Sequence, residues 1–214
     1  MPQGMEILRT NITTIASSEI NVSPEHIEKI VALLPGVSDV ALEGLPTESG
    51  RRSIITNLRH QLRIAIEPKR IALFDDSGQH PKDKDEKWFA LAKDIHTILN
   101  VETRAHGFNY EIEFESPNDR SSGEQIVSCL IKENVLQKLS GQAIGAWIRF
   151  QIRRQDVVYM FIFEPRRGDP TASTIFAKFN AHFDVQGLPE PQDLKQRFAS
   201  EFDALINDSM KVFG

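Results

Sequence analysis

Two short runs of arginine and glutamine stand out among the residues that can bind a ligand. The first run reads Leu-Arg-His-Gln-Leu-Arg at 58–63, and the second reads Ile-Arg-Phe-Gln-Ile-Arg at 148–153. Their polar members are Arg59, Gln61, Arg63, Arg149, Gln151 and Arg153. Arginine presents a planar fork of N–H donors that suits phosphate or carboxylate, and glutamine both donates and accepts hydrogen bonds. These six side chains are therefore the candidate binding residues.

The spacing of each run predicts a row of side chains on one face of a β-strand. Residues two apart on a strand project from the same face, about 6.6 Å from each other. Two such rows, brought together by pseudo-symmetry, would bind an anionic ligand, a nucleic-acid backbone or an acidic protein surface. Arg51 and Arg52 precede the first row and Arg166 and Arg167 follow the second, so they would enlarge the basic surface.

A structural explanation competes with the binding hypothesis. The two rows can form a solvated sheet face whose arginines pair across strands with acidic residues. Glu111, Glu113 and Glu115 lie on the polar face of another expected strand, at 108–115, and supply such acids. Both explanations stay open at the level of sequence.

The remaining polar residues suggest no catalytic or metal site. The acidic loop from Asp75 to Glu86, which includes His80, lacks the ordered ligand spacing of a calcium loop, so solvation and helix capping are expected there. Six histidines are scattered without metal-binding spacing, and His60 is expected in the apolar row of its strand. No nucleophile elbow, phosphate-binding loop or dinucleotide fingerprint is present. No catalytic residue, metal or cofactor is therefore predicted.

Hydrophobic periodicity predicts an α+β fold, mainly an antiparallel sheet with helices packed on one face. Ser23 and Pro24 are typical of a helix start. The expected strands lie at 7–15, within 37–45, and at 58–66, 70–74, 108–115, 146–154, 157–164 and 173–185. The expected helices lie at 24–34, 88–99, 124–139 and 194–213.

The similarity of the two runs suggests an internal duplication of a hairpin-strand-helix unit. Both follow the pattern aliphatic, Arg, any residue, Gln, aliphatic, Arg, and both precede a second strand. We therefore expect an N-terminal α+β unit at 1–118 and a C-terminal one at 119–214, closely packed or forming one continuous domain. Chance similarity between amphipathic hairpins is the alternative.

Composition narrows the class of protein. The chain has 214 residues, 40% of them hydrophobic, which is enough to bury a core. A net charge of -5 argues against coating nucleic acid through the overall field. The single cysteine, Cys129, excludes an intramolecular disulfide and a multi-cysteine zinc site. No signal-peptide pattern and no run of about 20 apolar residues is visible, so a cytoplasmic location without a membrane partner is expected.

These observations favour a non-enzymatic binding or assembly protein that recognises an anionic partner surface through paired arginine-rich strand faces. A protein partner or self-association is expected, and a local contact with nucleic acid is also open. One alternative is an enzyme or small-ligand sensor with a pocket between the two units, lined by Arg63, Arg153, His106 and Tyr110. Another is a subunit whose phenylalanine-rich C-terminal helix is covered by a second copy or by another protein.

Overall fold

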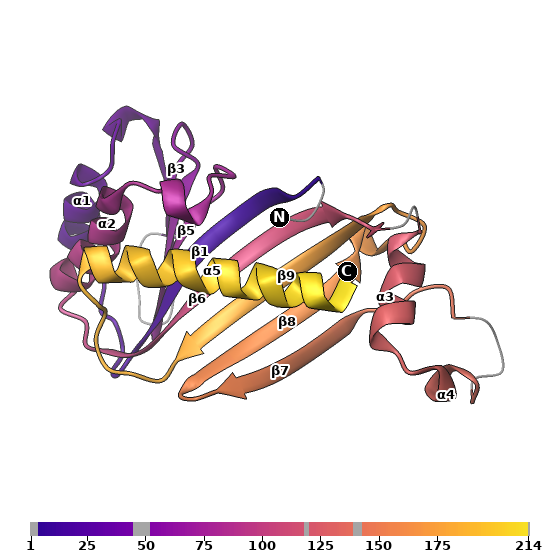
Figure 1. Cartoon of the computed structure of the whole chain (residues 1–214). Coiled ribbons are helices and arrows are strands. Elements are labelled where there is room, and N and C mark those ends of the chain that lie inside the picture. The colour runs from indigo at the N-terminus through magenta and orange to yellow at the C-terminus, as the bar shows by residue number, and fades with distance from the viewer. Residues whose placement is uncertain (1–3, 45–51, 118–119, 139–142, 214) are drawn as a thin grey trace. The chain divides into compact units, whose positions relative to one another are not determined.

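A computed structural model describes residues 4–44, 52–117, 120–138 and 143–213 (Figure 1). Within these residues the chain forms one antiparallel nine-stranded sheet, which is not closed, and five α-helices. The strand order is β2-β3-β4-β5-β1-β6-β9-β8-β7. The strands are β1 Glu6–Ala16, β2 Val40–Glu43, β3 Ser53–Asn57, β4 Leu62–Glu67, β5 Arg70–Asp75, β6 Thr103–Glu115, β7 Ile148–Arg154, β8 Val157–Pro165 and β9 Thr174–Phe183. The helices are α1 Pro24–Ala32, α2 Glu86–Ile98, α3 Ser122–Leu130, α4 Glu133–Leu136 and α5 Pro191–Phe213. The predicted α+β class is confirmed. None of the described helices is long and apolar enough to cross a membrane.

The chain divides into two compact units, each assembled from separate segments. We call Arg9–Asn109 with His182–Ala199 the amino unit. The carboxyl unit consists of Met1–Leu8, Tyr110–Ala181 and Ser200–Gly214. Four elements, β1, β6, β9 and α5, therefore contribute residues to both units.

The core of the amino unit lies between strands β2–β5 and β1 on one side and helices on the other. Alternate residues of these strands point toward the helices, and paired residues along this row are Ile55, Ile64, Leu73 and Ile12, all almost fully buried. Since side chains alternate along a strand, the paired residues one position further along, Thr56, Arg63 and Phe74, lie on the opposite face.

Helix α2 is attached to this core by a buried imidazole. His96 Nδ1 donates to the Ala92 carbonyl oxygen at 2.6 Å, so its Nε2 accepts from the Thr14 hydroxyl at 2.7 Å. The N-terminal part of α5 closes the same core, because Phe198 packs edge-on against Phe89 with ring centroids 5.6 Å apart.

Aromatic residues dominate the core of the carboxyl unit. Helix α5 lies over one face of the sheet, where Phe213 packs against Phe163 at 4.9 Å and Phe114 at 5.7 Å between ring centroids. On β7, Phe150 stacks almost parallel on Phe161 of β8, at 5.1 Å. The helix-covered face is therefore mainly aromatic and aliphatic in these strands.

Two predicted elements differ from the structure. The expected strand at 58–66 is present only from Leu62 onward, as β4, because residues 58–61 form a turn between β3 and β4; β3 was not predicted as a separate strand. Gln61 has a φ of 51°, in the left-handed region, which no strand residue adopts. The expected helix at 124–139 ends at Leu130, because Ile131 is extended with φ -112° and ψ 123°.

The internal duplication is not shown by the structure. The six-residue match pairs a turn and the first residues of β4 with a continuous strand, β7. The two similar six-residue sequences therefore adopt different local structures.

Candidate binding surface on β7

Strand β7 carries the second arginine run in the predicted arrangement. Arg149, Gln151 and Arg153 are exposed, while the alternating residues Ile148, Phe150 and Ile152 are half-buried. Phe150 belongs to the helix-covered aromatic core, so the three polar side chains point to the opposite face of the sheet. The predicted row of side chains on one strand face is therefore present here.

The arginines of this row lack the acidic neighbours that the structural explanation requires. Glu111 pairs with Lys178 at 2.7 Å, and Glu113 pairs with Arg166 at 3.1 Å. The cross-strand neighbours of the row on β8 are apolar: Ile162, Met160 and Val158. Among the residues that the structure describes, Arg149 and Arg153 have no ion-pair partner.

The next arginine along the chain is engaged differently. Arg154 Nη2 pairs with Asp208 of α5 at 2.7 Å, and its guanidinium lies 5.5 Å from the Tyr159 ring centroid. Its position places it on the helix-covered side, where it fixes α5 to the sheet. Arg154 is therefore a structural arginine, whereas Arg149 and Arg153 face solvent.

An exposed tryptophan extends the row. Trp147 is 61% exposed and precedes Arg149 by two residues, in phase with the alternation of β7. Its ring lies against the turn after β8, where a β-carbon on Gly168 would be 3.7 Å from Trp147 Cζ2. Arg167, in the same turn, is also exposed. Sequence reasoning missed Trp147, although its two-residue spacing from Arg149 was a usable signal. We call Trp147, Arg149, Gln151, Arg153 and Arg167 the β7 surface.

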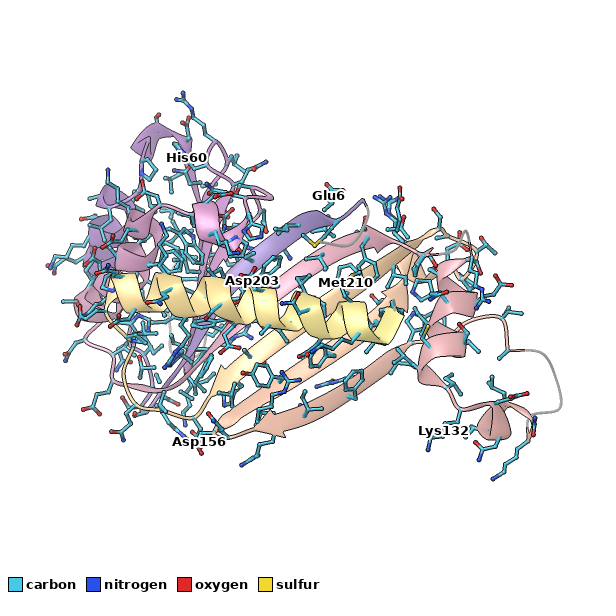
Figure 2. All side chains as sticks on the ribbon, viewed as in Figure 1. Glu6, His60, Lys132, Asp156, Asp203 and Met210 are labelled. Atoms are coloured by element: carbon cyan, nitrogen blue, oxygen red, sulfur yellow. The ribbon has the colours of Figure 1, made fainter. Side chains whose placement is uncertain are left out.

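The first arginine run does not form the predicted row. Arg59 and Gln61 lie in the turn between β3 and β4, together with His60, which is exposed rather than part of an apolar row (Figure 2). Arg63 alone of the run's three polar residues lies on a strand, and its guanidinium covers the Phe74 ring at 4.3 Å from the centroid. A strand row needs extended backbone throughout, and the turn interrupts it.

Gln61 and Arg63 instead line a pocket within the amino unit, of about 320 Å³. Its other polar lining residues include Glu43, Thr56 and Asp76. The Arg63 Nε is buried and has no hydrogen-bond partner in the described part of the chain. The lining thus mixes one cation with two carboxylates, which does not favour an anion.

The arginines expected to flank the two runs have separate positions. Arg52 pairs with Glu67 at 3.3 Å, and Arg51 lies outside the described residues. The two runs belong to different units, and β4 and β7 are not neighbours in the sheet order. The β7 surface is formed by residues of the carboxyl unit alone.

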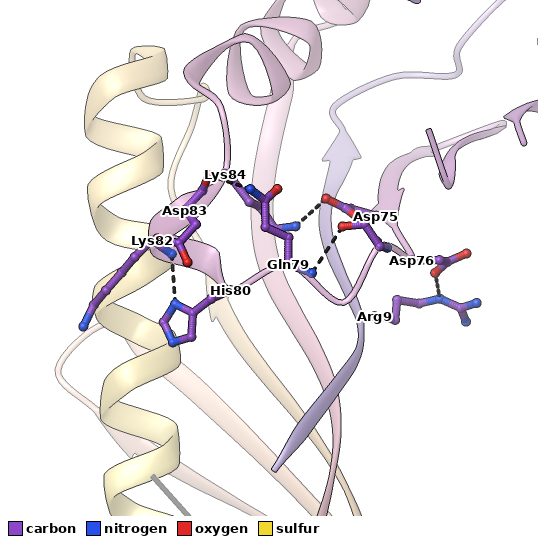
Figure 3. A network of polar contacts seen from close by, with 9 residues as sticks. Arg9, Asp75, Asp76, Gln79, His80, Lys82, Asp83 and Lys84 are labelled. Atoms are coloured by element: carbon purple, nitrogen blue, oxygen red, sulfur yellow. Dashed lines mark hydrogen bonds and ion pairs between the residues drawn. The ribbon is translucent and has the colours of Figure 1, made fainter. Parts of the chain in front are cut away.

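The acidic loop after β5 is an internal polar network (Figure 3). Asp75 pairs with Lys84 and also accepts a hydrogen bond from the Ser77 backbone at 2.7 Å, while Asp76 pairs with Arg9. Lys84 is only 1% exposed, and this burial lowers its pKa below the usual value although Asp75 opposes the change. No group of three metal-ligating side chains occurs among the residues whose placement is described.

The expected lining of an inter-unit pocket is wrong for two residues. His106 and Tyr110 are both 0% exposed, so neither side chain can contact a ligand in this conformation. The His106 ring stacks on Phe183 at 4.9 Å, and burial, with smaller contributions from Arg197 and His182, lowers its pKa to about 4. Burial raises the pKa of Tyr110 well above its ordinary value.

A second pocket of the amino unit, of about 460 Å³, lies beside the end of α2. It is lined in part by His96 and Lys93. Both His96 nitrogens are already hydrogen-bonded within the fold, and Lys93 pairs with Glu190. The imidazole and the ammonium group of this pocket are therefore both engaged within the fold.

Comparisons with protein-family models and with curated proteins find no match for this chain.

Proposed function

We propose that this chain is a non-enzymatic binding or assembly protein that recognises an anionic partner, an acidic protein or a nucleic-acid backbone, through the β7 surface. The observation that carries the proposal is the exposure of Arg149 and Arg153 on one strand face with no ion-pair partner among the described residues. Arginine forms bidentate hydrogen bonds with both carboxylate and phosphate.

The composition of the β7 surface supports a contact role. Tryptophan and arginine are enriched at the residues that dominate binding energy in protein interfaces. Trp147 is exposed at one end of the row and offers a flat apolar surface beside the guanidinium groups. Arg59, Gln61 and Arg63 form a separate candidate contact in the amino unit, because the turn removes them from any shared strand face.

Charge reversal on β7 tests the proposal. The probes are a fluorescein-labelled oligoglutamate and a fluorescein-labelled single-stranded oligonucleotide, with binding followed by anisotropy at two salt concentrations. The Arg149→Glu/Arg153→Glu variant should lose at least about tenfold in affinity for the probe that binds, and wild-type binding should weaken as salt increases.

A matched control separates local from overall charge. Lys87 and Lys138 are exposed lysines that do not belong to β7, and Lys87→Glu/Lys138→Glu changes the net charge by the same amount. This control should keep at least most of the wild-type affinity. Equal losses in the two double variants, or no binding of either probe to the wild-type protein, would contradict the proposal.

A further inference from the structure

We propose that the partner of β7 is an acidic amphipathic β-strand of another protein, which adds antiparallel to the outer edge of this strand. The inference rests on the proposed function and specifies the class of partner. It depends on three features of β7: its position in the sheet, the direction of its main-chain groups, and the different chemistry of its two faces.

Strand β7 is an edge strand of useful length. It has seven residues and is the last strand in the sheet order, with β8 as its neighbour (Figure 1). An edge strand presents unpaired N–H and C=O groups that can pair with a further strand. The other edge of the sheet, β2, has four residues and offers a shorter template.

The β7–β8 hairpin determines which main-chain groups face outward. Gln155 and Asp156 form a two-residue turn, and Asp156 marks its tip in Figure 2. In such a hairpin the flanking residues, Arg154 and Val157, form the hydrogen-bonded pair that closes the turn. Hydrogen-bonded pairs alternate along an antiparallel ladder, so Arg149, Gln151 and Arg153 direct their N–H and C=O groups away from β8.

The side chains specify the sequence of the added strand. Directly opposite residues in an antiparallel pair lie on the same face, so residues opposite Arg149 and Arg153 would be acidic. On the other face Ile148, Phe150 and Ile152 are half-buried, and apolar residues of the added strand would cover their exposed parts. The matching strand therefore alternates acidic and apolar residues.

A second copy of this chain, paired symmetrically about Gln151, does not fit the same edge. Antiparallel self-pairing centred on Gln151 would place Arg149 of each copy opposite Arg153 of the other. Like charges directly opposite each other destabilise a sheet. In this register the row disfavours self-association at β7, whereas an acidic strand complements it.

Backbone-methylated peptides test strand addition without altering the protein. The parent probe is a fluorescein-labelled Glu-Val-Glu-Val-Glu-Val-Glu peptide. In an antiparallel complex the glutamate N–H groups face β7 and the valine N–H groups face away. Methylation of the glutamate nitrogens should weaken binding by at least about tenfold, whereas methylation of the valine nitrogens should leave it nearly unchanged. All three peptides carry the same side-chain charges.

A protein variant provides an independent arm. Gln151→Pro removes an outward N–H without removing a bond to β8, and proline is accepted on edge strands in this orientation. Gln151→Ala is its control. Affinity for the parent peptide should fall in Gln151→Pro and persist in Gln151→Ala, with near-equal melting temperatures showing that both variants are folded.

The outcomes distinguish this inference from the proposed function. Equal affinity of the three peptides for the wild-type protein overturns strand addition, even if Arg149→Glu/Arg153→Glu still abolishes binding. Tighter binding of a single-stranded oligonucleotide than of the parent peptide, with Gln151→Pro unaffected, also overturns it in favour of nucleic acid. If the charge-reversed variant binds the parent peptide as tightly as the wild type, both proposals fail.

Discussion

Lys84 and Asp75 form a buried ion pair whose integrity should govern the stability of the amino unit. The side chains are 1% and 10% exposed, and Lys84 also lies 5.2 Å from the Trp88 ring centroid. Removing one partner leaves the other as an unpaired buried charge. Lys84→Met or Asp75→Leu alone should therefore lower the free energy of unfolding by about 3–5 kcal/mol.

The double variant provides the control for that prediction. Lys84→Met/Asp75→Leu removes both charges together, so its loss should be smaller than the sum of the two single losses by at least about 1 kcal/mol. Urea unfolding of the four proteins measures the coupling. Simple additivity would show that the two residues do not stabilise each other.

His106 should make the stability depend on pH between about 4 and 6.5. Burial lowers its pKa in the folded protein from 6.5 to about 4, whereas the unfolded chain keeps the ordinary value. Between these values the unfolded state binds more protons, so the free energy of unfolding is highest above pH 6.5 and decreases as pH falls toward 4. The full difference corresponds to about 3 kcal/mol.

A substitution isolates this contribution from that of the other histidines. His106→Leu should retain its stability better than the wild type when both are unfolded in urea at pH 7 and at pH 4.5. Nuclear magnetic resonance of the wild-type imidazole should show no titration above pH 5. A midpoint near 6.5 would mean that the ring is not buried as described.

At the scale of the element, the turn of the β7–β8 hairpin contains a residue in an unfavourable conformation. Gln155 has a φ of 52°, which glycine adopts without the steric cost that a β-carbon imposes. Gln155→Gly should therefore stabilise the protein by about 0.5 kcal/mol, despite the greater freedom of glycine in the unfolded chain.

The neighbouring position gives the opposite sign. Asp156 has an ordinary negative φ, so Asp156→Gly should destabilise by about 0.5–1 kcal/mol. Thermal unfolding of both variants beside the wild type measures the difference. A loss of stability in Gln155→Gly comparable to that in Asp156→Gly would contradict the strain argument.

The two arginine runs show which structural features the sequence could predict. On β7 the alternation of Ile148, Phe150 and Ile152 with polar residues reflects a real strand with one face in the core. At 58–63 the same alternation spans a turn, where Leu58 is 70% exposed and packs in no core. The alternation of apolar and polar residues predicts the two-residue period of a strand, but it does not predict the left-handed conformation at Gln61.

Only the local part of the candidate site could be predicted from the sequence. The row of Arg149, Gln151 and Arg153 follows from local periodicity, which sequence contains. The absence of acidic neighbours depends on the order of strands, because β6, with Glu111 and Glu113, lies next to β1 and β9 and not next to β7. The order of strands in a sheet cannot be predicted from the local pattern of a single sequence. The partners of these acidic residues could therefore be identified only from the structure.

At the scale of the whole molecule, the sharing of β1, β6, β9 and α5 predicts one cooperative unfolding transition. The chain has two tryptophans, Trp88 in the amino unit and Trp147 in the carboxyl unit. In Trp147→Phe, fluorescence reports the amino unit alone, while circular dichroism reports all helices and strands. The two signals should change at the same urea concentration. A fluorescence midpoint clearly below the circular dichroism midpoint would show that the amino unit unfolds separately.

The segmented amino unit also constrains the order of events during synthesis. Phe198, which is fully buried, packs against Phe89 and Phe108 with ring centroids 5.6 and 5.2 Å away. The ribosome makes residues 9–109 first, yet their core lacks this ring until translation has proceeded into the last helix, α5. Domains usually fold in the order in which they are made. Here the nascent amino unit must wait, with an incomplete aromatic core, for residues added nearly a hundred positions later.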